Sequence, residues 1–158
     1  MRACSFGINL PLTGSPGIEC RTGGASGNHQ VIATFAVPVT FTSVAVTSGT
    51  GSVTSATGSG TTAVTVNLTG VANAQKIIVT LFGVSDGTNS GNLDIPMGVL
   101  LGDTSGNATV NSSDVSQTKI KSGQAVDVTN FRTDVTVSNS INGTDVSSVK
   151  ARVGTALP

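Results

Sequence analysis

One 12-residue pattern of oxygen-bearing side chains occurs twice in the last third of the sequence, at residues 103–114 and again 31 residues later at 134–145. In each copy an aspartate begins and ends the pattern, oxygen-bearing side chains stand at positions 3, 5 and 9, and an aliphatic residue stands at position 8. Carboxylate, hydroxyl, amide and backbone carbonyl oxygens at this spacing could together surround one hard cation. No other part of the sequence indicates a specific chemistry.

The spacing is that of the EF-hand calcium loop, in which position 7 acts through its backbone carbonyl and position 9 often through water. The candidate ligands of the first loop are Asp103, Ser105, Asn107, Thr109 and Asp114. Those of the second loop are Asp134, Thr136, Ser138, Ser140 and Asp145. Position 9 is occupied by Asn111 and Asn142. The sequence therefore predicts two calcium sites.

A short helical pattern follows each loop, but none precedes the first loop, because Ile95–Gly102 contains Pro96 and Gly98. A tandem of such half EF-hands resembles the type I dockerin domain. The resemblance covers roughly residues 100–158 and rests on the loop-to-helix junctions Val110–Val115 and Ile141–Val146. It implies a calcium-dependent module that attaches an extracellular protein, often a polysaccharide-degrading enzyme, to a cohesin-type or other cell-surface partner.

The resemblance also implies contact residues. In dockerins, loop positions 10 and 11 and basic residues on the following helix usually meet the partner. In this chain they correspond to Ser112, Ser113, Lys119, Lys121, Gly143, Thr144, Lys150 and Arg152. The alternative interpretation of each lysine is a solvated helix face.

Both loops depart from the family pattern. Dockerin loops usually carry Asp or Asn at positions 3 and 5 and Gly at position 6, whereas the first loop has Ser105 and Ala108 and the second has Thr136, Ser138 and Asn139. A left-handed alanine costs on the order of 1 kcal/mol, and asparagine tolerates this conformation better. With two carboxylates in each loop, we expect dissociation constants near ~10⁻⁴ to 10⁻³ M, with loop 103–114 the better candidate. The alternative is a loop without metal, held by Asp and Asn side-chain hydrogen bonds to its own backbone.

The elements that must position the loops are mostly strands. Apolar and polar residues alternate over 31–37, 41–47, 62–69 and 75–84, with weaker strands at 52–56 and 93–101 and turn residues between them. We expect a mainly β chain with small α content: a flexible arm or linker at 1–27 with one strand at 18–21, an antiparallel immunoglobulin-like β-sandwich at 28–100 and the dockerin-like module at 101–158. No helical pattern occurs before residue 110, and Phe131 is the candidate to fill a core between the two repeats.

Composition excludes several classes of function. Eight basic and eight acidic residues give no net charge, and the chain has neither Trp nor Tyr, so it lacks the basic and stacking surfaces that nucleic acids require. No stretch reaches the roughly 20 apolar residues of a membrane span. Catalysis is not expected, because His29 is the only histidine and no nucleophile motif or carboxylate pair accompanies it. Two alternatives to attachment stay open: a structural or sorting tail without metal or cohesin partner, and a weakly carbohydrate-binding sandwich.

Both cysteines, Cys4 and Cys20, lie in the first twenty residues. In an exported protein they could form a disulfide worth about 3 kcal/mol, and two unrelated thiols are the alternative. The first residues do not form a secretory signal. We therefore hypothesise an extracellular or cell-surface location for the chain as the C-terminal fragment of a longer exported protein.

Overall fold

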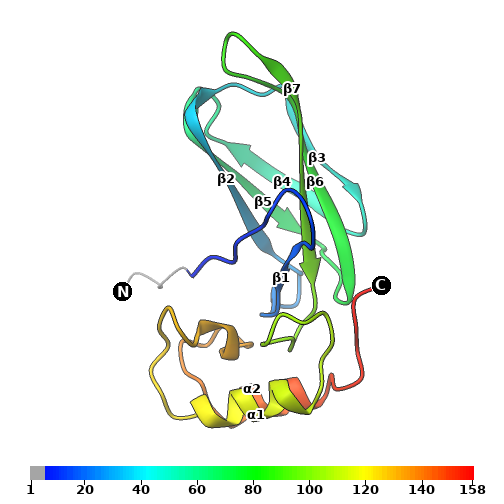
Figure 1. Cartoon of the computed structure of the whole chain (residues 1–158), viewed down its shortest axis with the longest axis vertical. Helices are drawn as coiled ribbons and strands as arrows, with labels where there is room; N and C mark the ends of the chain where they lie inside the picture. Colours follow the sequence, from blue (N-terminus) through cyan, green and yellow to red (C-terminus); the bar gives the residue numbers. More distant parts are fainter. Residues whose placement is uncertain (1–5) are drawn as a thin grey trace. The chain divides into compact units, whose positions relative to one another are not determined.

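The computed structural model describes residues 6–158 (Figure 1). The described chain is mainly β with two small α-helices, which confirms the expected class. The strands are β1 (Gly17–Glu19), β2 (His29–Val39), β3 (Ser43–Ser48), β4 (Ser52–Thr57), β5 (Thr61–Thr69), β6 (Gln75–Ser85) and β7 (Ser90–Val99). The helices are α1 (Ser112–Lys121), the 3-10 turn η1 (Phe131–Thr133) and α2 (Gly143–Lys150). As expected, no helix precedes residue 110 in the described residues.

The chain divides into two compact units. The strand unit comprises residues 23–72 and 76–97, and the described part of the helical unit comprises residues 6–22, 73–75 and 98–158. This division differs from the predicted one, in which residues 1–27 form an arm and the repeats begin at 101. Each unit is assembled from segments that are far apart in the sequence, a property that periodicity within one segment does not reveal.

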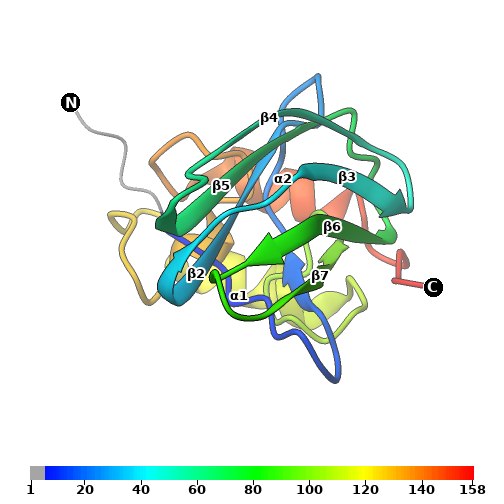
Figure 2. The same cartoon turned by 90° about the horizontal axis from the view of Figure 1, so that it is seen from above.

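The strand unit contains two sheets, which Figure 2 shows as separate layers. One has the order β2-β5-β4, and in the other β6 lies between β3 and β7. Alternate residues of β5 and β6 are fully buried, because a strand points successive side chains to opposite faces. The buried side chains of β5 and β6 are Val64, Val66, Leu68, Ile77, Val79 and Leu81. The central position of β6 agrees with its apolar composition.

Strand β2 continues past Pro38, where the sequence predicts an end. Pro38 cannot donate to a sheet ladder, but β2 is an edge strand that pairs only with β5. The register of that pair shifts between Thr34 and Val39, so Val37 is half exposed while Val39 is buried. An irregular edge therefore accommodates the proline.

Segment 17–22 is an integral part of the helical unit. Leu100 N–H donates to Glu19 O at 2.9 Å, and Gly102 N–H donates to Cys20 O at 2.9 Å. Ile18 joins the buried apolar cluster that the repeats build, whose other members are Leu100, Val110, Val135 and Val149. The strand expected at 18–21 is present as the shorter β1, but residues 17–22 pack into the helical unit and do not belong to a flexible arm. The many Gly, Pro and Ser residues in 1–27 suggest an exposed segment, yet Ile18 and Cys20 within it are buried.

Phe131 does not occupy the core between the repeats, contrary to the expectation. Its ring stacks on Phe6, with 5.3 Å between the ring centroids, and the Arg21 guanidinium lies 5.0 Å from the Phe131 centroid. The aliphatic residues at loop position 8, Val110 and Ile141, are buried instead. Aliphatic side chains thus fill the space between the repeats, and the Phe131 ring packs against Phe6 of the N-terminal segment.

The two repeats pair reciprocally. Gly154, after α2, donates its N–H to Val110 O of the first loop at 2.8 Å. Gly123, after α1, donates in the same way to Ile141 O of the second loop at 2.8 Å. Each loop is thus held by the segment that follows the other loop's helix, and α1 and α2 contact each other. The sequence repeat is also an approximate two-fold repeat of backbone contacts.

Candidate functional site

The first aspartate of loop 103–114 organises the loop backbone. Asp103 is fully buried. Its Oδ1 accepts the N–H groups of Gly106 and Asn107 at 2.9 and 3.1 Å, and its Oδ2 accepts Ala108 N–H at 2.9 Å. The Ser105 hydroxyl, from position 3, donates to the same Oδ1 at 3.2 Å. The loop therefore wraps around the carboxylate at position 1.

The closing aspartate, Asp114, faces the same loop from the first turn of α1. It is also fully buried. Its Oδ1 accepts Ser105 N–H at 2.9 Å, and its Oδ2 accepts Asn111 N–H at 2.9 Å. Ser105 donates its hydroxyl to Asp103 and its backbone N–H to Asp114. Both predicted carboxylate ligands therefore contact Ser105.

Loop 134–145 repeats this arrangement. Asp134 Oδ1 accepts Ser138 N–H and its Oδ2 accepts Asn139 N–H, both at 2.9 Å. Asp145 Oδ1 accepts the N–H and hydroxyl of Thr136 at 3.0 and 2.7 Å, and its Oδ2 accepts Asn142 N–H at 2.9 Å. Asp134 and Asp145 are both buried. The loops therefore share the backbone N–H bonds from positions 3, 5, 6 and 9 to the two aspartates, whereas the hydroxyl at position 3 bonds to Asp103 in the first loop and to Asp145 in the second.

The remaining predicted ligands make local contacts in the loops. Asn107 Oδ1 accepts the N–H and hydroxyl of Thr109 at 3.0 and 2.9 Å. The Ser138 hydroxyl donates to Ser140 O at 3.0 Å. These side chains are exposed, so each loop has a buried side with carboxylates and an exposed side with hydroxyl and amide groups. The atoms of these residues that could bind a cation are all oxygens.

The backbone is left-handed at loop positions 4 and 6. At position 6, φ is 67° for Ala108 and 62° for Asn139, as the sequence predicts for the glycine position of a calcium loop. At position 4, φ is 75° for Gly106 and 56° for Val137. A β-branched residue in this conformation is strained, so Val137 is the costliest departure in the second loop.

Each loop ends in a capping box that begins its helix. The Asn111 side chain accepts Ser113 N–H at 2.8 Å, while Asp114 accepts the Asn111 N–H. Asn142 does the same with Thr144 N–H at 2.8 Å, and Asp145 closes the second box. Reciprocal capping satisfies helix N–H groups that would otherwise lack partners. The aspartate at position 12 thus serves both the helix and the loop.

Among residues 6–158, the hydrogen-bond donors to the four loop carboxylates are all neutral. Within residues 6–158 the recorded ion pair is Arg21–Glu19 at 2.7 Å, and it involves none of them. Buried carboxylates are costly unless a cation compensates their charge. The described residues contain no cluster of three or more His, Cys, Asp or Glu, so a cation in either loop would rely on two carboxylates and on neutral oxygens.

The predicted partner-contact residues lie at the starts and ends of the two helices. Most are exposed: Ser112, Ser113, Lys119, Gly143, Thr144 and Lys150. Lys121 and Arg152 are half-buried, and the Arg152 guanidinium, just after α2, donates to Ser148 O of that helix at 3.0 Å. Ile120, beside Lys119 on α1, is 72% exposed. Exposed apolar and basic side chains therefore lie together on α1.

The cysteine prediction is described only in part. Cys20 is fully buried, and its Sγ donates to Arg132 O at 3.4 Å. Burial raises the pKa of the Cys20 thiol to about 12. Cys4 lies outside the described residues, so its pairing with Cys20 stays a prediction.

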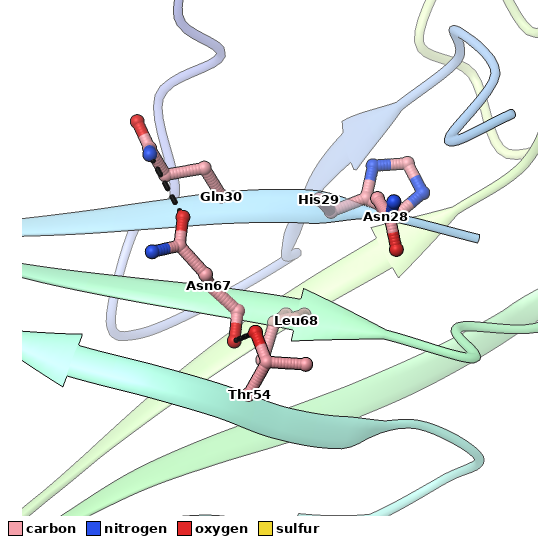
Figure 3. A pocket seen from close by; sticks show the side chains of 6 residues that line it. All are labelled: Asn28, His29, Gln30, Thr54, Asn67 and Leu68. Atoms are coloured by element: carbon pink, nitrogen blue, oxygen red, sulfur yellow. Dashed lines mark hydrogen bonds between the residues drawn. The ribbon is translucent and has the colours of Figure 1, made fainter. Parts of the chain in front are cut away.

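An open depression of about 440 Å³ lies on the strand unit (Figure 3). It is lined by Asn28, His29, Gln30, Thr54, Asn67 and Leu68. Gln30 Nε2 donates to Asn67 Oδ1 at 2.9 Å, and Thr54 Oγ1 donates to Asn67 O at 3.1 Å. These polar groups bond to one another across β2, β5 and β4, and the lining includes no Phe. The depression offers no flat hydrocarbon ring of the kind on which sugars stack.

Arg132 is the residue that sequence reasoning missed. It lies in η1, two residues before the second loop, yet its guanidinium contacts the first: Nε donates to Thr104 O at 2.9 Å and Nη2 to Asp103 O at 2.8 Å. Its Nη1 donates to Ile18 O at 3.0 Å. The spacing of ligands within a 12-residue loop gives no signal for a contact between loops.

No family model, curated protein or solved structure matches the chain. None of the described helices is long and apolar enough to cross a membrane.

Proposed function

We propose that the two loops bind calcium and that the ion stabilises the helical unit. The observation that carries this proposal is the pair of buried carboxylates in each loop, whose hydrogen-bond donors within the described residues are all neutral. The ligands would be the side chains at positions 1, 3, 5 and 12 and the backbone carbonyl at position 7, namely Thr109 and Ser140. The ion would supply the positive charge that the described hydrogen-bond partners do not.

The donor chemistry fits calcium better than the commoner transition metals. The candidate ligand atoms are carboxylate, hydroxyl, amide and carbonyl oxygens, which hard cations prefer. Histidine and cysteine, the ligands that zinc selects, are absent from both loops. Two carboxylates leave each site only weakly anionic, which corresponds to the affinity range of extracellular modules.

We further propose that the calcium-loaded helical unit is a dockerin-like attachment module of an exported bacterial protein. Support comes from the reciprocal pairing of two half EF-hands and from the exposed residues at the helix starts. A cohesin-type or cell-surface protein is the proposed partner. The strand unit would be an immunoglobulin-like β-sandwich that carries the module, consistent with its two sheets.

A calcium titration followed by thermal melting tests the metal. With dissociation constants of 10⁻⁴ to 10⁻³ M, about 10 mM calcium should stabilise the protein by roughly 1.4–2.7 kcal/mol per site, and EDTA should remove the gain. Asp114→Asn should remove the contribution of the first site. Ser116→Ala, an exposed change on the same helix, is the matched control and should keep it. An unchanged melting temperature in wild type would contradict calcium binding.

Capture of the partner tests attachment. The full chain should retain a cohesin-type protein on a column in calcium and release it in EDTA. The triple variant Ser112→Ala, Ser113→Asp and Lys119→Glu should retain less of the cohesin-type protein. Its calcium-dependent melting temperature should stay unchanged. A module that binds calcium but no such protein would support a structural or sorting tail. Retention on insoluble polysaccharide without calcium dependence would favour the carbohydrate-binding alternative.

A further inference from the structure

Arg132 makes three hydrogen bonds to backbone carbonyls and none to a loop carboxylate side chain within the described residues. Two of the acceptors, Asp103 O and Thr104 O, belong to positions 1 and 2 of the first loop, at 2.8 and 2.9 Å. Its Nη2 also lies 3.5 Å from the place where a Cβ on Gly106 would stand, so it packs behind position 4. A planar guanidinium with several donors fixes the direction of such carbonyls more strictly than a single ammonium group does.

The backbone that carries Arg132 is joined rigidly to the second loop. Asp134 N–H donates to Phe131 O at 3.2 Å, and Thr133 N–H donates to Asn130 O at 2.8 Å. Asp134 is position 1 of the second loop and follows Arg132 by two residues. A rearrangement of Asp134 around an ion would therefore move the guanidinium that holds the first loop.

A second contact continues this path to the closing carboxylate of the first loop. Thr104, whose carbonyl accepts from Arg132, donates its hydroxyl to Asp114 Oδ1 at 3.3 Å. Arg132 thus contacts the backbone of Asp103 directly and reaches Asp114 through Thr104. The backbone of Asp103 and the carboxylate of Asp114 are therefore connected to the segment that begins the second loop.

Within residues 6–158, this connection has no counterpart in the opposite direction. The residue that stands 31 positions before Arg132 is Leu101, which has no side-chain donor. The carbonyl of Val135, which corresponds to Thr104, accepts Thr22 N–H at 2.8 Å instead. The contact therefore belongs to this chain and does not follow from the repeat itself.

We propose that Arg132 is a positioning residue that couples calcium binding at the two loops, so that an ion in loop 134–145 raises the affinity of loop 103–114. This inference rests on the proposed calcium binding. Couplings between sites commonly change affinity by about 5- to 150-fold. We expect the lower part of this range, because the path consists of two guanidinium contacts with backbone carbonyls and one hydroxyl contact, all of which are present without metal.

A double-mutant cycle followed by NMR tests the coupling. The amide signals of Ala108 and Asn139, which bond to Asp103 and Asp134, report the two loops separately during a calcium titration. In the wild-type background, Asp145→Asn should abolish binding at the second loop and weaken binding at the first by about fivefold or more. In an Arg132→Met background, Asp145→Asn should change the first-loop affinity by less than about twofold.

Controls separate coupling from folding and from the metal proposal. Arg152→Met removes an arginine that lies just after α2 and bonds back to Ser148 of that helix, so the effect of Asp145→Asn should persist there. Arg132→Lys keeps the charge, and it replaces Arg132→Met if the methionine variant does not fold. An equal effect of Asp145→Asn in the wild-type and Arg132 backgrounds, or binding at one loop alone, overturns the coupling only. Absence of calcium-dependent shifts at both amides in wild type overturns the proposed function as well.

Discussion

At the scale of single residues, Val137 carries the clearest local strain. It holds a φ of 56° at loop position 4, where its counterpart in the first loop is Gly106. Its side chain is 51% exposed, so little packing opposes a change there. The second loop therefore retains its hydrogen-bond pattern at a cost that the first loop avoids.

Replacing Val137 by glycine should raise the free energy of unfolding by about 1 kcal/mol, because glycine adopts this conformation without steric penalty. Urea denaturation measures the difference. Val153→Gly is the matched control, because Val153 is 52% exposed and does not have a positive φ. Equal effects of the two changes would show that φ at Val137 is not the cause.

The buried thiol of Cys20 predicts a pH dependence in the reduced protein. Its pKa is about 12 in the folded chain against an ordinary value of 9.0, so between these values the folded state keeps a proton that the unfolded state loses. The free energy of unfolding should therefore fall as pH rises through this window, by up to about 1.4 kcal/mol per pH unit. Denaturation at about pH 8 and about pH 10.5 should show a smaller decrease in Cys20→Ala than in wild type. Parallel decreases would contradict the assignment.

At the scale of elements, the capping boxes begin helices that have little else to stabilise them. Helix α2 spans only Gly143–Lys150, and isolated helices of this length are marginal in water. The Asn142 side chain accepts Thr144 N–H of its first turn, and the Asp145 side chain accepts the N–H of Asn142 itself. The cap and the contacts of α2 with the core therefore decide whether α2 forms.

Asn142→Ala should lower the free energy of unfolding by about 1 kcal/mol, because Thr144 N–H loses its acceptor. The measurement is urea denaturation in EDTA, which removes any contribution of calcium. Ser147→Ala changes an exposed residue of the same helix outside the cap and should have a smaller effect. If both variants have the same free energy of unfolding as wild type, the cap does not stabilise α2.

Local elements were predictable from the sequence, whereas contacts between distant segments were not. The alternation in β5 and β6, the helix after each loop and the left-handed turn at Ala108 and Asn139 each depend on a few adjacent residues. Segment 17–22 and Arg132 act through contacts across 112 to 114 residues, which no periodicity encodes. Glycine and proline around Ile18 favour an arm when the sequence is considered alone. Whether the loops hold calcium stays a prediction.

At the scale of the whole molecule, the helical unit is discontinuous in sequence. Ile18 lies in its buried cluster although the loops begin about 85 residues later. A fragment cut at the predicted boundary, residues 101–158, therefore lacks Ile18, Cys20 and Leu100.

The fragment 101–158 should melt at a lower temperature than the helical unit of the full chain, even in saturating calcium. In the full chain, Ile18→Ala should cost about 2–3 kcal/mol, because it removes buried methyl groups from that cluster. Leu12→Ala is the control, since Leu12 is 54% exposed in the same N-terminal segment. A fragment as stable as the full chain would show that residues 17–22 contribute nothing to the unit.

The pairing of segment 17–22 with the second repeat also sets an order of events during synthesis. The Cys20 thiol bonds to Arg132 O, 112 residues further along the chain. At 5–20 residues per second, the ribosome needs on the order of 10 s to make that stretch. During this interval Ile18 and Cys20 have no native partners from the second repeat. Residues 17–22 can therefore complete their native contacts only after Val135, whose carbonyl accepts Thr22 N–H, has been made.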